Sequence, residues 1–213
     1  FGHGLHGLLS QVRYESQSGT NVKQDFVELP SQIMEHWATE PSVLRNYARH
    51  VDTGETIPDV LIDKLLAADT FNQGFATTEY LAASYLDMAW SGLEAPTMLG
   101  VDEFEAQAMA AINLIDVVGP RYNSGYFQHI FAGDNYSAGY YAYIWAEVLD
   151  ADGFEAFKEN GIFDPATALS FRQNVLERGG TAEAMSLYQA FRGRAPAVEP
   201  LLKKRGLLTT SST

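Results

Sequence analysis

The chain has 213 residues, enough to bury a hydrophobic core within one extended domain. It carries 14 basic and 27 acidic residues, and the net charge of -13 disfavours nucleic acids and anionic membranes as partners. The absence of cysteine excludes disulfides and thiolate chemistry, and no apolar run approaches the ~20 residues that span a membrane.

Helical periodicity and helix-stop signals predict an all-α fold. The expected helices, in chain order, cover residues 1–16, 24–39, 41–50, 59–68, 70–93, 102–114, 138–160, 165–178, 181–192 and 198–204. Glycine, proline and asparagine mark breaks such as 18–21, 96–100 and 132–135. No segment shows the alternation of a strand that we would assign, so at most one small hairpin is expected. The tail 209–213 is low in complexity and is predicted to be disordered.

Two residues near the start are candidate metal ligands. His3 and His6 are three residues apart and therefore share a helix face, although such histidines also occur as ordinary core or surface residues. Glu28 lies in an apolar run and needs a partner if it is buried; it could equally belong to a helix N-terminus or a solvated turn. His3 and Glu28 together are a stronger indication of a metal site than either residue alone.

The first three residues, Phe1-Gly2-His3, match the last three positions of the motif His-Glu-Phe-Gly-His, a form of H-E-x-x-H. That pattern places two histidines one helical turn apart for zinc, with a glutamate between them as general base. We therefore expect the chain to begin inside a zinc motif, with the second histidine, His3, present.

Four tyrosines follow His129 in a segment that also contains Gly133 and Gly139. They are Tyr136, Tyr140, Tyr141 and Tyr143. At helical spacing, the first, second and fourth of them fall on one face, which by itself is compatible with ordinary amphipathic packing.

Long segments of the sequence resemble the thimet oligopeptidase family of zinc metallopeptidases. The matching segments are 3–9, 18–21, 25–28, 30–39, 127–131, 136–145, 192–196 and 205–207. The resemblance covers nearly the whole chain. It implies that residues 1–213 form the C-terminal, all-α part of a zincin-like catalytic domain, truncated inside the zinc motif.

The resemblance implies a zinc-dependent peptidase that releases dipeptides from the C-terminus of oligopeptides. Zn²⁺ would be held by His3, Glu28 and a histidine that precedes this chain. Tyr143 would donate its phenol to the oxyanion of the tetrahedral intermediate. Tyr136 would hydrogen-bond the substrate backbone or that intermediate, and His129 would bind or polarise the substrate. The loop before Tyr136 is longer than in some family members, which makes the alignment of His129 less secure.

Further expectations concern residues around this site. Glu35 could orient a ligand imidazole or form a surface salt bridge, and the substrate carboxylate could bind Arg121, Tyr122 or another basic residue. Because the first zinc histidine and the general-base glutamate are missing, the isolated chain is expected to be inactive.

The implied partners are oligopeptides and the missing N-terminal part of the same enzyme, with neither nucleic acid nor membrane. The expected compartment is the cytoplasm, with the periplasm as the alternative. A function from another class also stays open, namely a non-catalytic helical module that binds peptides or another protein.

Overall fold

The computed structural model describes residues 1–208, so the expected disordered tail 209–213 lies outside the described residues. The helices are α1 (Gly2–Leu9), α2 (Leu29–Ala38), α3 (Pro41–Tyr47), α4 (Asp59–Ala68), α5 (Gln73–Ser91), α6 (Val101–Ala111), α7 (Gln128–Phe131), α8 (Ala142–Asn160), α9 (Pro165–Phe171), α10 (Ala184–Arg192) and α11 (Glu199–Lys204). Short 3₁₀ turns cover Glu15–Gln17 and Ser124–Tyr126, and a π-helical turn covers Arg172–Leu176.

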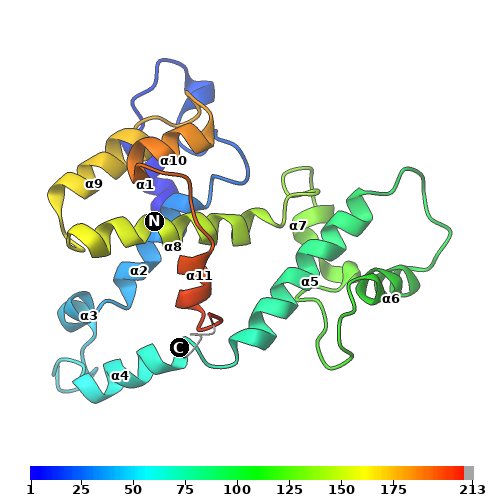
Figure 1. The fold of residues 1–213 in the computed structure, drawn as a ribbon, viewed down its shortest axis with the longest axis horizontal. Coiled ribbons are helices and arrows are strands. Elements are labelled where there is room, and N and C mark those ends of the chain that lie inside the picture. Colours follow the sequence, from blue (N-terminus) through cyan, green and yellow to red (C-terminus); the bar gives the residue numbers. More distant parts are fainter. Residues whose placement is uncertain (209–213) are drawn as a thin grey trace, which may run out of the picture. The chain divides into compact units, whose positions relative to one another are not determined.

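The all-α prediction is confirmed for the described part of the chain (Figure 1), whose β-pairing is limited to one isolated antiparallel bridge between Arg49 and Thr56. None of the helices within residues 1–208 is both long and apolar enough to cross a bilayer. The chain divides into two compact units. The first comprises Phe1–Phe71 and the chain from Ile144 onward, and the second comprises Asn72–Tyr143.

The first unit is built around α8, which contributes Leu149, Phe154 and Phe157 to its core. In Figure 1, α8 lies among α1, α2, α9 and α10. The other buried side chains of this cluster are Phe26, Leu29, Ile33, Ala156, Phe171, Val175, Leu176, Leu187, Tyr188 and Phe191. Helices distant in sequence are therefore joined mainly by burial of aliphatic and aromatic surface.

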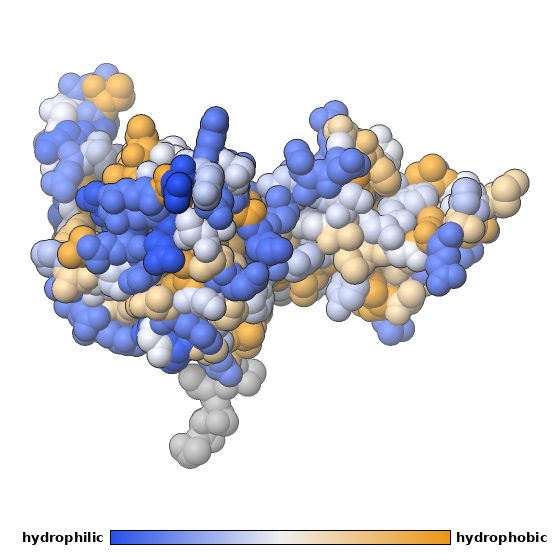
Figure 2. Space-filling view, turned by 90° about the horizontal axis from the view of Figure 1, so that it is seen from above, coloured by the Kyte–Doolittle hydropathy of each residue, from blue (hydrophilic) through white to orange (hydrophobic). Residues whose placement is uncertain are grey.

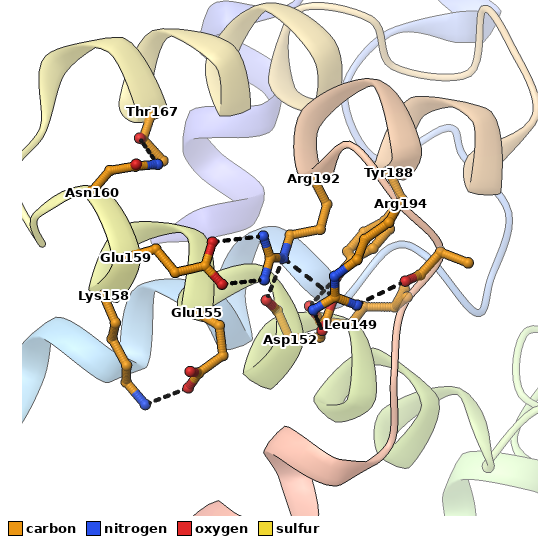
Figure 3. Close-up of polar contacts among 11 residues, drawn as sticks. Leu149, Asp152, Glu155, Lys158, Glu159, Asn160, Thr167, Tyr188, Arg192 and Arg194 are labelled. Carbon is orange, nitrogen blue, oxygen red and sulfur yellow. Dashed lines mark hydrogen bonds and ion pairs between the residues drawn. The ribbon is translucent and has the colours of Figure 1, made fainter.

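A buried carboxylate, Asp152, fixes the end of α10 against α8 (Figure 3). The Tyr188 hydroxyl donates to Asp152 Oδ2 at 2.6 Å, and the Arg194 guanidinium donates to Oδ1 at 2.5 Å. Arg192 Nε donates to the Asp152 backbone carbonyl at 3.0 Å and its terminal nitrogens form a two-point ion pair with Glu159. A charge removed from water needs such partners, and Asp152 has them in the Tyr188 hydroxyl and the Arg194 guanidinium.

The segment between α1 and α2 contains less helix than the sequence predicted. Helix α1 ends at Leu9 rather than near residue 16, and α2 begins at Leu29 rather than at residue 24. The reason is tertiary. Backbone N–H groups pair across to another turn, with Gln11 donating to the Glu177 carbonyl at 2.8 Å and Gly180 donating to the Gln17 carbonyl at 2.8 Å. These bonds take the place of a continued helix.

The second unit contains α5, α6 and α7 with an aromatic interior. Trp90 of α5 packs on Phe104 of α6 with ring centroids 3.9 Å apart, and its indole N–H donates to Ser124 Oγ at 2.8 Å. Large apolar side chains also lie on its surface, among them Met98 and Val117, and orange areas interrupt the polar surface on the right of Figure 2.

A glycine allows the start of α1 to touch the start of α2. A Cβ added at Gly2 would lie 2.3 Å from the backbone oxygen of Pro30 and 2.3 Å from the backbone nitrogen of Ser31. At Gly4, in the same helix, nothing lies within 4 Å of an added Cβ.

Gly2→Ala should therefore destabilise the chain, because two backbones would have to separate, by about 1–3 kcal/mol as for other overpacked sites. Gly4→Ala is the matched control and should be neutral or stabilise the chain, since alanine favours helix by up to about 1 kcal/mol over glycine. Urea denaturation of both variants measures the difference. Similar stabilities would show that the close contact of α1 with α2 does not govern the packing.

Candidate active site

The first unit brings His3 and Glu28 together. His3 lies in α1, Glu28 is the residue that precedes α2, and His3 Nε2 is 3.3 Å from Glu28 Oε2. The His3 backbone N–H donates to Ser31 Oγ at 3.1 Å, which ties the same two elements together. The His3 side chain is 44 % exposed and that of Glu28 is 13 % exposed, so the imidazole of this pair reaches the surface.

This donor pair suits zinc, which binds imidazole nitrogen and carboxylate oxygen. Catalytic zinc sites commonly take three protein ligands, and residues 1–208 contain no group of three or more histidine, aspartate or glutamate side chains able to hold a metal ion. His3 and Glu28 would therefore supply part of a site and need a further ligand.

Glu35 and His6, two residues that the sequence analysis considered together with this pair, differ in burial. Glu35 is exposed and makes no ion pair within residues 1–208, so the expected surface salt bridge is not found there, and the expectation that it orients a ligand imidazole stays a prediction. His6 is completely buried, and neither ring nitrogen has a hydrogen-bond partner among residues 1–208. The pKa of His6 falls from 6.5 to about 4, first because burial disfavours the imidazolium and second because His3 lies nearby. His6 is therefore neutral at pH 7.

The buried His6 should make stability depend on pH. Below pH 6.5 the unfolded chain takes up a proton at His6, whereas the folded chain does so only near pH 4, so stability is full above this window and is lost as pH falls through it. Between pH 7 and pH 5 the expected loss is about 2 kcal/mol.

Urea denaturation at the two pH values tests this. His6→Gln should remove most of that loss, whereas His50→Gln, at an exposed histidine, should keep it. The same pH dependence in His6→Gln and in the unaltered chain would contradict the role assigned to burial.

The second unit gathers the other predicted residues into one cluster of rings. Tyr136 and Tyr143 stack on each other with ring centroids 5.3 Å apart, and His129 lies beside both of them, 5.9 and 6.1 Å away and edge-on. Tyr140 lies 5.5 Å from His129 and 5.4 Å from Tyr143. Tyr122 joins the cluster 5.3 Å from His129. Phenol hydroxyls donate hydrogen bonds without carrying charge, which is what a developing oxyanion requires.

The prediction that Tyr136, Tyr140 and Tyr143 share a helix face is wrong. Helix α8 begins at Ala142, so only Tyr143 is helical, whereas Tyr136 lies in a bend and Tyr140 in a turn. Ala138 has a φ of 55°, which interrupts a right-handed helix at that point.

The physical reason for this turn is Asp87, a residue that the sequence analysis missed. Its carboxylate, completely buried in α5, accepts the backbone N–H groups of Ala138 and Tyr140, both at 2.9 Å, and the hydroxyl of Ser91 at 3.1 Å. The available signal was an acid between Leu86 and Met88, the same kind of pattern that drew attention to Glu28.

The segment that precedes the cluster is held in a similar way. Glu105 of α6 accepts the Ser124 backbone N–H at 2.6 Å, the Ser124 hydroxyl at 2.8 Å and the Asn123 side-chain amide at 2.5 Å. Two buried or half-buried carboxylates thus fix the chain on both sides of His129. The cluster is consequently positioned by backbone contacts to acids on α5 and α6.

Comparisons with known proteins agree with the resemblance inferred from the sequence. Residues 1–207 match the model of Peptidase family M3. Dipeptidyl carboxypeptidase of Escherichia coli (strain K12) is 47% identical over 209 residues, which cover 97% of this chain and 30% of that protein. Oligopeptidase A of the same organism is 41% identical over 212 residues, covering 97% of this chain and 31% of that protein. A probable cytosolic oligopeptidase A of Arabidopsis thaliana is 39% identical over 222 residues, covering 100% of this chain and 31% of that protein.

The chain therefore spans less than a third of the length of these curated relatives. The match to the family model nevertheless extends over almost all of it, including both groups of predicted site residues. This chain belongs to peptidase family M3.

Proposed function

We propose that this chain provides part of the metal site and the oxyanion donors of a zinc-dependent peptidase that releases dipeptides from the C-terminus of oligopeptides. The observation that carries the proposal is the 3.3 Å approach of His3 to Glu28 in a chain that is 47% identical to a dipeptidyl carboxypeptidase. The cluster of His129, Tyr136 and Tyr143 supports it, because such a reaction needs neutral donors at the developing oxyanion.

His3 and Glu28 would hold the zinc ion, together with a histidine that the family resemblance places upstream. When bound, zinc supplies the Lewis acidity that activates water and polarises a carbonyl. Tyr143 donates its phenolic hydrogen to the oxyanion, and Tyr136 donates to the substrate backbone or to the same oxyanion. His129 orients the substrate beside them. The general base is the upstream glutamate of the H-E-x-x-H pattern, which takes a proton from the attacking water and passes it to the leaving amine.

The partners in this proposal are oligopeptides and a longer N-terminal part of the same polypeptide, and its compartment is the cytoplasm. The relatives support the longer polypeptide, because this chain covers 30% to 31% of their lengths. The net charge of -13 fits a peptide substrate better than a polyanion.

The proposal predicts that activity requires both the upstream ligands and the metal. The 213-residue chain alone should release no measurable dipeptide, because the general base and one zinc ligand are lacking. A polypeptide that joins it to its upstream segment should release dipeptides from free C-termini, lose this activity with a chelator and regain it with zinc. Product analysis by mass spectrometry measures both.

Two outcomes would count against this account. Turnover by the 213-residue chain alone would show that no upstream base is needed. Peptide binding without turnover in the longer, zinc-loaded polypeptide would favour the non-catalytic binding module instead.

The oxyanion role predicts the kinetics of a conservative variant. In the active polypeptide, Tyr143→Phe should lower kcat about 10²- to 10³-fold, the loss expected for one oxyanion donor. KM should change little, because the contact forms only as the oxyanion develops. The ring contacts with His129 and Tyr136 are retained, so the fold should persist.

The matched control is Tyr141→Phe, since Tyr141 is a near neighbour with an exposed side chain. Steady-state kinetics on both variants decide the role. An unaltered kcat in Tyr143→Phe, or a defect confined to KM, would remove Tyr143 from the oxyanion site.

A further inference from the structure

A completely buried carboxylate in the second unit binds the segment that joins the two stacked tyrosines. Both oxygens of Asp87 accept backbone N–H groups, Oδ1 from Ala138 and Oδ2 from Tyr140, each at 2.9 Å. These two residues lie 51 and 53 positions from Asp87 in the sequence. Both lie between Tyr136 and Tyr143, the proposed donors, so the contact acts on the chain that connects them.

Ser91, one turn along α5 from Asp87, reinforces this contact. Its hydroxyl donates to Asp87 Oδ1 at 3.1 Å and accepts the same Ala138 N–H at 3.0 Å. Residues four positions apart share one face of a helix, so the two side chains point to the same part of the backbone. Asp87 and Ser91 thus form one acceptor site for residues 138–140, which we call the α5 clamp.

The turn that the α5 clamp holds is one that an L-residue rarely adopts. Ala138 has a φ of 55°, in the left-handed region that a side chain with a Cβ disfavours. The Gly139 N–H donates to the Tyr136 carbonyl at 2.8 Å, and a Cβ added at Gly139 would lie 3.3 Å from the Tyr136 Cα. Backbone of this kind persists only where its surroundings hold it, and it is concentrated at functional sites.

We propose that Asp87 is a positioning residue for the reaction, because the α5 clamp sets where the Tyr136 and Tyr143 phenols lie relative to each other. The inference rests on the proposed peptidase function. The two rings stack 5.3 Å apart with an interplanar angle of 6°. An oxyanion site requires donors that are in place before the charge develops, and a shift of about 1 Å at such a site can cost about 10²-fold in rate. Loss of the clamp should therefore slow the reaction, although Asp87 itself is buried.

The alternative is that Asp87 only stabilises the fold. Asp152 provides a matched control, since its carboxylate is also completely buried and accepts hydrogen bonds from the Tyr188 hydroxyl and the Arg194 guanidinium. It belongs to the first unit, whereas the tyrosine segment up to Tyr143 belongs to the second. A role limited to stability should make Asp87→Asn and Asp152→Asn alike in their effect on the reaction. A positioning role should separate them.

Hydrogen exchange in the 213-residue chain tests the contact without any turnover. The amides of Ala138 and Tyr140 should exchange slowly, although both precede α8. Asp87→Asn should speed the exchange of at least one of them about 10- to 100-fold, because a carboxamide accepts through only one of its two polar atoms. Ser91→Ala should have a smaller effect, confined to Ala138, and Asp152→Asn should affect neither amide. Circular dichroism confirms that each variant is folded.

Kinetics in the longer active polypeptide test the consequence for the reaction. Asp87→Asn should lower kcat about 10- to 100-fold with little change in KM, because the positioned phenols act on the transition state. Asp152→Asn should leave kcat unaltered. In the Tyr143→Phe background, Asp87→Asn should cost a clearly smaller factor than in the unaltered polypeptide, because the donor that it positions is already absent.

These experiments separate the inference from the proposed function. If the unaltered polypeptide cleaves no peptide, the proposed function fails, while hydrogen exchange still decides whether the α5 clamp holds the segment. The role of Asp87 is overturned if exchange at residues 138 and 140 is the same in Asp87→Asn as in the unaltered chain. It is also overturned if kcat is unaltered, or if the effects of Asp87→Asn and Tyr143→Phe simply multiply. Should Asp87→Asn fail to fold, Ser91→Ala takes its place, with the same pattern expected at smaller size.

Discussion

Buried carboxylates that accept several donors organise both units of this chain. Asp152 in α8 accepts a hydrogen bond from Tyr188 and forms ion pairs with two arginines. Asp87 in α5 accepts hydrogen bonds from backbone N–H groups of the tyrosine segment. Each carboxylate is costly to remove from water, and each is retained because its partners are placed around it. The segments that supply those partners are thereby fixed to a helix that is distant in sequence. The positions of the candidate site residues depend on this constraint.

The effect is clearest at the tyrosines. Without Asp87, a stretch such as Ser137 to Tyr143 could continue α8 toward its N-terminus, and its side chains would follow helical spacing. Binding of two backbone N–H groups by one carboxylate, with a left-handed residue at Ala138, turns the chain instead. Tyr136 and Tyr143 then stack face to face with His129 beside them. The cluster is pre-set by the protein, which is what electrostatic stabilisation of a transition state requires.

The two candidate groups supply different chemistry. The first unit presents a nitrogen and an oxygen donor suited to a metal ion, and the second presents phenol hydroxyls and an imidazole. Both groups lie within residues 1–207, which match the model of Peptidase family M3.

The sequence by itself determined the all-α class, the bounds of α4 at 59–68 and the family. It also singled out His3 and Glu28, because both signals are local: His3 belongs to an incomplete H-E-x-x-H motif, and Glu28 is an acid in an apolar run. Local signals could not show that α1 ends at Leu9, since the Gln11 N–H that follows donates to the distant Glu177 carbonyl. Nor could they show that the Asp87 carboxylate accepts the backbone N–H groups of Ala138 and Tyr140. Those facts arise from contacts between residues far apart in the sequence, 51 positions for Asp87 and Ala138 and 166 (177 − 11) for Gln11 and Glu177, which only the tertiary structure brings together.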